Sequence, residues 1–173
     1  MIGIIGQGFV GNAVYQKFKN FYDILTYDID KEKCNSTLDN LIFKSETIFV
    51  CLPTPMNKDG SCDTSILNES LSNIDLVADN LETIKTIIIK STIPPGTTDK
   101  FNKQYPALNI VFNPEFLTER NAVKDFENQN RIIIGGPRPV TTEVKTIFSK
   151  VFPKSHIIKT DSSHAEMIKY MTN

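Results

Sequence analysis

The chain of 173 residues has the length of one domain and an ordinary globular composition, with 40% hydrophobic and 23% charged residues. Its 19 basic and 20 acidic side chains leave a net charge of −1, and no basic stripe or polybasic run indicates a nucleic-acid or membrane-surface partner. The N-terminal stretch "MIGIIGQGFVG" lacks the features of a signal peptide, and no apolar run is long enough to span a membrane.

The first predicted element is a short apolar strand, "IGIIG", that leads into a glycine cluster. Gly6, Gly8 and Gly11 form a G-x-G-x-x-G pattern before a helix whose apolar side chains step by four from Val10. In this context the first glycine allows a tight turn, the second lets the backbone approach a pyrophosphate, and the third lets helix and strand pack closely. A glycine-rich turn without a ligand is the alternative, but the strand–turn–helix context favours nucleotide binding.

The second strand, "DILTYDI", carries a carboxylate at its end. Asp28 lies 22 residues after Gly6, close to the spacing expected for an acidic residue that binds the adenosine ribose. A carboxylate there disfavours a 2′-phosphate, so NAD is predicted over NADP. Lys33 could reach the same ribose edge, whereas Asp30 is expected to face solvent. The crossover that follows is short, with room for one or two helical turns around residues 38–43.

Five further segments, "TIFVCL", "TIIIKST", "NIVF", "RIIIGG" and "SHIIKT", are apolar almost throughout, which is typical of strands buried on both faces. Apolar side chains recur at helical spacing over residues 67–81 and 144–151. This alternation of strand and helix predicts an α/β fold with a Rossmann-like, doubly wound, mainly parallel sheet and helices on both faces.

Unusual loops follow the third, fourth and fifth strands: "CLPTP", "KSTIPPGTT" and "FNPEFL". Ligands of open α/β sheets lie beyond the carboxyl ends of the strands, so these loops are expected to form the rim of one crevice. Their prolines stiffen the turns. For Thr54, Ser91, Thr92 and Glu115, a role in ligand binding stands beside the alternative of rigid turns alone.

The last ten residues, "HAEMIKYMTN", predict a helix. Ser163 and Glu166 have capping-box spacing, and Lys169 and Asn173 lie four residues apart on one helix face. The alternative is that Glu166 pairs with Lys169 at i,i+3, which would make both ordinary surface residues.

The ordered motifs "GQGFVG", "YDID", "CLPTP", "DGSCDTS", "KSTIPPGTT", "NPEFLTERNAVKDFENQNRIIIGG" and "AEMIKYMTN" cover almost the whole chain. Together they resemble the NAD-binding N-terminal domain of the UDP-glucose/GDP-mannose dehydrogenases. The resemblance implies an NAD-binding domain over residues 1–161 and the start of the family's central helix over residues 162–173. Members of the family oxidise the C6 alcohol of a nucleotide sugar to a carboxylate in two NAD-dependent steps, through a cysteine-bound thioester.

The resemblance also implies roles for individual residues. Thr92 would orient a water molecule, Glu115 would be the acid/base for thioester hydrolysis, and Lys169 with Asn173 would stabilise the developing oxyanion. Glu119 would lie near the nicotinamide. The residues expected to contact the cofactor are Gly6, Gly8, Phe9, Val10, Gly11, Asp28, Lys33, Leu52, Pro53, Thr54, Ser91, Thr92 and Glu119.

The chain departs from the family pattern at several points. It has no counterpart of the glycine-rich segment that carries the family's essential cysteine, its second crossover is short, and Arg120 replaces a common glycine. Cys34, Cys51 and Cys62 fit neither a disulfide framework nor a zinc site, so we expect reduced thiols in a cytoplasmic protein and no metal. Cys51 is expected in the core and Cys34 at the surface.

We therefore expect the chain to bind NAD without completing the four-electron oxidation by itself. Its expected partners are a nucleotide sugar of the UDP-glucose type and a catalytic half, with a homodimer as a further association. One alternative is a stand-alone nucleotide-binding or regulatory module without catalysis. Another is a minimal hydroxyacid dehydrogenase, since lysine–asparagine pairs also serve in that group.

Overall fold

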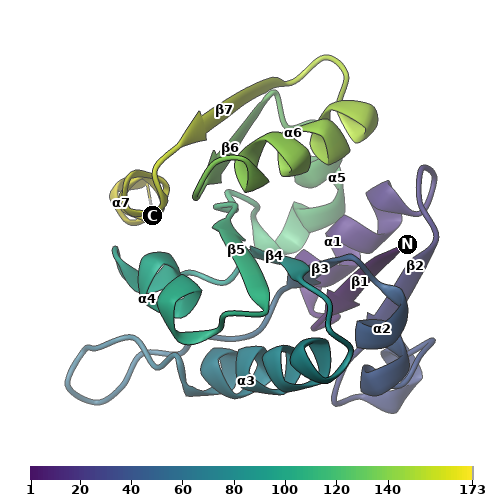
Figure 1. The fold of residues 1–173 in the computed structure, drawn as a ribbon. Coiled ribbons are helices and arrows are strands. Elements are labelled where there is room, and N and C mark those ends of the chain that lie inside the picture. Colours follow the sequence, from purple (N-terminus) through teal and green to yellow (C-terminus); the bar gives the residue numbers. More distant parts are fainter. Residues whose placement is uncertain (173) are drawn as a thin grey trace.

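The computed structural model describes residues 1–172, so the predicted role of Asn173 lies outside the described residues. Seven strands form one sheet in the order β2-β1-β3-β4-β5-β6-β7 (Figure 1). The strands are β1 (Ile2–Ile5), β2 (Ile24–Tyr27), β3 (Thr47–Val50), β4 (Lys85–Ile89), β5 (Leu108–Phe112), β6 (Arg131–Gly135) and β7 (His156–Thr160). The helices are α1 (Phe9–Phe18), α2 (Leu38–Lys44), α3 (Ser65–Asn80), α4 (Thr97–Gln104), α5 (Ala122–Glu127), α6 (Val140–Val151) and α7 (Ser162–Thr172), with short 3₁₀ turns η1 (Lys31–Lys33) and η2 (Glu119–Asn121).

The sheet is mainly parallel, as predicted, and each apolar segment named above forms one of its strands. The exception is the β5–β6 pair, which is antiparallel and shares the register pair Phe112–Gly135. β1 pairs with β2 on one side and with β3 on the other, so the strand order reverses direction at β1. In open α/β sheets, this reversal opens a crevice at the carboxyl ends of the strands.

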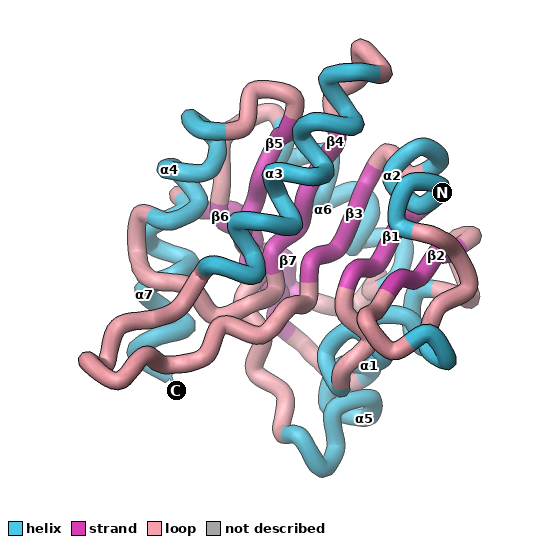
Figure 2. Tube along the Cα trace, turned by 90° about the horizontal axis from the view of Figure 1, so that it is seen from below, coloured by secondary structure: helices cyan, strands magenta, loops and turns pink. Residues whose placement is uncertain are grey.

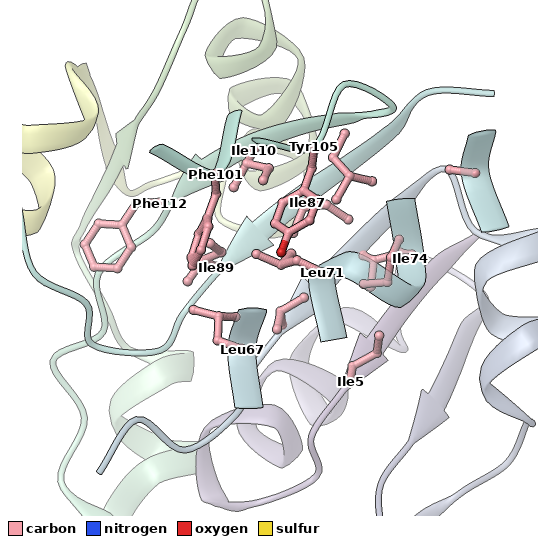
Figure 3. Close-up of a cluster of buried hydrophobic side chains, with 14 of the residues drawn as sticks. Ile5, Leu67, Leu71, Ile74, Ile87, Ile89, Phe101, Tyr105, Ile110 and Phe112 are labelled. Atoms are coloured by element: carbon pink, nitrogen blue, oxygen red, sulfur yellow. The ribbon is translucent and has the colours of Figure 1, made fainter. Parts of the chain in front are cut away.

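Helices cover both faces of the sheet, and each face has its own apolar cluster. In Figure 2, α3 crosses in front of the sheet, while α6 lies behind it. On one face, Leu67 and Leu71 of α3 and Phe101 of α4 pack against sheet residues such as Ile87 (Figure 3). On the other face, α1, α5 and α6 pack around Phe18. Burial of these side chains is the main stabilising contribution.

Phe18 illustrates how tightly the second cluster is packed. Its ring meets Phe49 of β3 edge-on at 5.0 Å between centroids and Phe148 of α6 at 5.5 Å. Edge-to-face rings at such separations are favourable beyond their buried area. The contact fixes α1, and with it the glycine turn at the start of α1, against the sheet.

Candidate functional site

The glycines of the turn between β1 and α1 have different structural roles. Gly6 has φ of +90°, and a Cβ there would lie 2.4 Å from the carbonyl oxygen of Cys51. A Cβ at Gly11 would lie 1.8 Å from the carbonyl oxygen of Gly6. A Cβ at Gly8 would meet nothing within 4 Å, although Gly8 is the N-cap of α1. Gly6 and Gly11 therefore allow close packing, while Gly8 leaves an open approach to the positive end of a helix, as a pyrophosphate requires.

A cleft of about 610 Å³ opens where β1, β2 and β3 end. Ile29, 96% exposed, and Ile66, 43% exposed, add apolar surface that the sequence reasoning missed. The buried stripe of α3 begins at Leu67, and Ile66 does not fit the spacing of that stripe. This mismatch was the sign in the sequence that Ile66 does not face the core. Predicted cofactor residues that line the cleft are Gly6, Gly8, Phe9, Val10, Asp28, Lys33, Leu52 and Pro53.

Asp28 is held at the mouth of this cleft by backbone hydrogen bonds. Its Oδ2 accepts from the N–H of Gln7 at 2.6 Å, and its Oδ1 accepts from the N–H of Asp30 at 2.9 Å. Partial burial raises the pKa of Asp28, but the hydrogen bonds from Asp30 and Gln7 and the nearby Lys33 charge outweigh it and lower the pKa overall. The side chain is therefore a carboxylate at neutral pH. Asp30 is exposed, as predicted, and pairs with Lys33 at 3.4 Å.

The loops after β3 and β4 are tied to each other by the predicted hydroxyl residues. Ser91 Oγ accepts from the N–H of Leu52 at 3.1 Å, and Thr54 Oγ1 donates to the carbonyl oxygen of Thr92 at 2.7 Å. The half-buried Cys62 Sγ lies 3.7 Å from the same carbonyl oxygen. These hydroxyls hold the two loops together at one end of the sheet.

Glu115, after β5, and Lys169, in α7, meet although 54 positions separate them. Lys169 Nζ donates to the carbonyl oxygen of Glu115, while the Glu115 carboxylate accepts from the N–H of Leu117. Both side chains are buried, at 9% and 8% exposed. Burial lowers the pKa of Lys169, and the nearby Glu115 partly offsets this. The structure thus brings the buried ammonium of Lys169 against the backbone of the loop that carries Glu115.

Comparison with known proteins gives the family of this chain. The model of the UDP-glucose/GDP-mannose dehydrogenase family, NAD binding domain, matches residues 33–154. The chain belongs to this family. It is an NAD-binding domain of the UDP-glucose/GDP-mannose dehydrogenases, which are NAD-dependent nucleotide-sugar enzymes, and the resemblance inferred from its motifs is confirmed.

This dehydrogenase domain spans about half or less of the length of the relatives that it matches. A putative UDP-glucose 6-dehydrogenase of Bacillus subtilis is 30% identical over 210 residues, which cover 99% of this chain and 48% of the relative. A UDP-glucose 6-dehydrogenase of Campylobacter jejuni is also 30% identical, over 99% of this chain and 51% of the relative. A UDP-glucose dehydrogenase structure from Pyrobaculum islandicum has a TM-score of 0.85 at 19% identity, covers 99% of this chain and 48% of that one, and shows the common fold.

For Glu166 of this dehydrogenase domain, the predicted capping box is wrong, and so is the alternative of a surface pair. Glu166 neither closes a capping box with Ser163 nor forms a surface pair with Lys169. Its fully buried carboxylate accepts from the N–H of Gly96 at 2.6 Å, and from the N–H and hydroxyl of Thr98 at 2.8 and 2.6 Å. It therefore caps α4, because two N–H groups at that helix start and the hydroxyl of Thr98 all donate to it.

Lys90, at the end of β4, is a buried cation that the sequence reasoning missed. Its Nζ donates to Oδ1 and the carbonyl oxygen of Asn113 at 2.7 and 3.3 Å. Asn113 Nδ2 in turn donates to the carbonyl oxygen of Ile133 in β6 at 2.7 Å. Burial lowers the pKa of Lys90, and Glu115 and Cys51 oppose this. The sign in the sequence was a lysine directly after the apolar run "TIII". A lysine at the end of a buried strand is rarely buried unless it is paired, so a partner could have been expected.

Glu119 lies outside the cleft at the ends of β1, β2 and β3, as do Gly11, Thr54, Ser91 and Thr92. It is exposed in η2 and lines a separate shallow cleft with Phe9 and Asn12 of α1. Within residues 1–172 no group of His, Cys, Asp and Glu side chains is arranged to hold a metal ion. None of the described helices has the length and apolar character needed to cross a membrane.

Proposed function

We propose that this chain is the NAD-binding half of a nucleotide-sugar 6-dehydrogenase of the UDP-glucose type. Residues 1–161 would hold the cofactor, and residues 162–173 would begin the helix that leads to a substrate-binding half. The observation that carries the proposal is the buried meeting of Glu115 and Lys169 in a domain whose β1–α1 turn fits NAD. A nucleotide sugar and the second half are the proposed partners, with a homodimer as a further association.

The cofactor contacts follow from the geometry of the glycine turn and Asp28. The open backbone at Gly8 and the N-terminus of α1 would face the pyrophosphate, and Asp28 would accept hydrogen bonds from the ribose hydroxyls. The negative charge of Asp28 would repel a 2′-phosphate. Bound NAD supplies the hydride acceptor of the reaction. Further contacts are proposed for Gly6, Phe9, Val10, Gly11, Lys33, Leu52, Pro53, Thr54, Ser91, Thr92 and Glu119.

The catalytic roles rest on groups that are already fixed in place. Lys169, whose ammonium is bound to the Glu115 carbonyl oxygen, would stabilise negative charge that develops on the sugar oxygen. The Glu115 carboxylate would exchange a proton with water, and Thr92 would orient that water. Asn173, predicted beside Lys169, would add a donor. The 173 residues contain no counterpart of the family's cysteine segment, so hydrolysis of a thioester needs the second half.

The experiment that tests the proposal is calorimetric titration of the chain with NAD and NADP, beside the variant Asp28→Ala. We expect saturable NAD binding, weaker NADP binding, and a loss of NAD affinity of about tenfold or more in the variant, because hydrogen bonds to a carboxylate are lost. Equal affinity of the variant and the wild type for NAD would contradict the assignment of Asp28.

A further inference from the structure

The outer edge of β2 pairs with no further strand of the sheet within residues 1–172. β2 is the last strand on its side of the sheet (Figure 2). In the strand order 3-2-1-4-5-6 of dinucleotide-binding folds, a further strand lies against this edge. Here residues 28–46, which connect β2 to β3, contain η1 and α2 but no strand. An edge strand without a partner exposes a row of backbone N–H and C=O groups, and its end frays easily.

Two consecutive residues, Cys34 and Asn35, bind that edge in place of a strand. Asn35 Oδ1 accepts from the N–H of Thr26 at 2.7 Å, and Asn35 N–H and Nδ2 donate to the carbonyl oxygens of Thr26 and Ile24 at 3.3 and 3.0 Å. Cys34 Sγ accepts from the N–H of Asp28 and donates to its carbonyl oxygen, each at 3.1 Å. We call Cys34 and Asn35 the edge clamp.

The edge clamp ends at Asp28, whose carboxylate is proposed to bind the ribose. The inward backbone groups of β2 bond to β1, and Tyr27 O accepts from the N–H of Gly6. The outward backbone of Asp28 is held by Cys34, while its carboxylate is held by Gln7. Asp28 is thus fixed at both its backbone and its side chain, which removes the ordering cost on binding.

From this geometry we propose that Cys34 is a positioning residue for NAD: its thiol holds the backbone of Asp28 so that the carboxylate meets the ribose. The inference rests on the proposed ribose contact of Asp28. It also corrects the expectation that Cys34 is simply exposed, because the side chain is half-buried and lines a cleft of about 550 Å³ next to the cofactor cleft. A thiol is a weak donor and a weak acceptor, and here it serves as both.

The test compares NAD affinity in three variants by calorimetry. Cys34→Ala removes both bonds to Asp28 and should weaken NAD binding about five- to tenfold. Cys34→Ser keeps a donor and an acceptor and should restore most of the affinity. Ser36→Ala is the matched control, because within residues 1–172 the Ser36 hydroxyl bonds only to Thr37 and Asn40 of the same crossover, and its loss should leave affinity unchanged.

A double-mutant cycle distinguishes positioning from a general loss of structure. If Cys34 acts through Asp28, Cys34→Ala should cause no further loss in an Asp28→Ala background. An equal loss in both backgrounds would overturn the proposal. Unchanged affinity in Cys34→Ala, while Asp28→Ala alone weakens binding, would overturn it and leave the proposed function standing.

Amide hydrogen exchange, measured by NMR without cofactor, provides an independent readout. The Asp28 amide should exchange faster in Cys34→Ala than in the wild type, while amides of β1 keep their protection. An unchanged exchange rate at Asp28 would overturn the clamp whether or not NAD binds.

Discussion

Asp28 shows how a single side chain acquires a fixed charge at the sheet edge. Two backbone amides, of Gln7 and Asp30, point at its two oxygens, and Lys33 lies nearby. Hydrogen bonds of this kind favour the ionised form and so outweigh the effect of partial burial. The same hydrogen bonds also orient the carboxylate towards the glycine turn. They therefore set both the ionised state and the direction of the Asp28 side chain.

The lowered pKa of Asp28 predicts a pH dependence of stability. Because the folded-state pKa lies below the ordinary value of 3.8, the carboxylate stabilises the folded state above that value. This contribution is lost as the pH falls through the lower, folded-state pKa. Urea unfolding at a series of acidic pH values should show a steeper loss of stability for the wild type than for Asp28→Asn. Parallel curves for the two proteins would contradict the prediction.

At the scale of elements, α7 and α4 are joined by one buried carboxylate. Glu166 of α7 binds Gly96 and Thr98 at the start of α4, directly after the "STIPPG" loop that follows β4. Burial raises the pKa of Glu166 more than these hydrogen bonds lower it. Lys169 follows Glu166 in the same helix, three residues on, so the contact that fixes α7 also places the cation beside Glu115.

This link predicts a large effect of one substitution. Glu166→Ala should lower the free energy of unfolding by about 2 kcal/mol or more, because the buried donors of Thr98 and the half-buried N–H of Gly96 would lose their acceptor. Glu166→Gln keeps one acceptor oxygen of similar shape and should cost less. Chemical denaturation of both variants measures the difference. A Glu166→Ala variant as stable as Glu166→Gln would show that the carboxylate does not link the two helices.

The junction of β5 with β6 is a second place where side chains replace regular pairing. The two strands run antiparallel and share one register pair. Lys90 and Asn113 bridge β4, β5 and β6 through successive hydrogen bonds at this point. A buried ammonium is costly unless it is fully hydrogen-bonded, so Lys90 has to keep its bonds to Asn113. These bonds hold Asn113, where the loop that carries Glu115 begins.

For the whole molecule, the sequence predicted best those features whose cause is local. The seven strands were visible because burial on both faces leaves an unbroken apolar run. The glycine turn and Asp28 were visible through their spacing. α4 was not predicted, since Phe101 is its only large apolar residue, and α5 was not, since it has only six residues. The partners of Glu166 lie about 70 positions away in the chain, so no local pattern could identify them.

The environments of the three cysteines support the proposal that the chain does not complete the oxidation alone. A nucleophilic cysteine needs a readily formed thiolate. Burial raises the pKa of Cys51 to about 12 and also raises the pKa of Cys62, while the Cys34 thiol is bound to the backbone of Asp28. None of the three therefore has the environment of an activated nucleophile.

We expect the chain, incubated with UDP-glucose and NAD, to form no NADH beyond the rate without protein, although calorimetry shows NAD bound. The control is a full-length UDP-glucose 6-dehydrogenase under the same conditions, followed by NADH absorbance and by detection of the sugar acid. Formation of UDP-glucuronate by this chain would contradict the prediction. Variants of Cys34, Cys51 and Cys62 to alanine would then identify the thiol responsible, and loss of activity in Cys62→Ala would place the nucleophile beside Thr92.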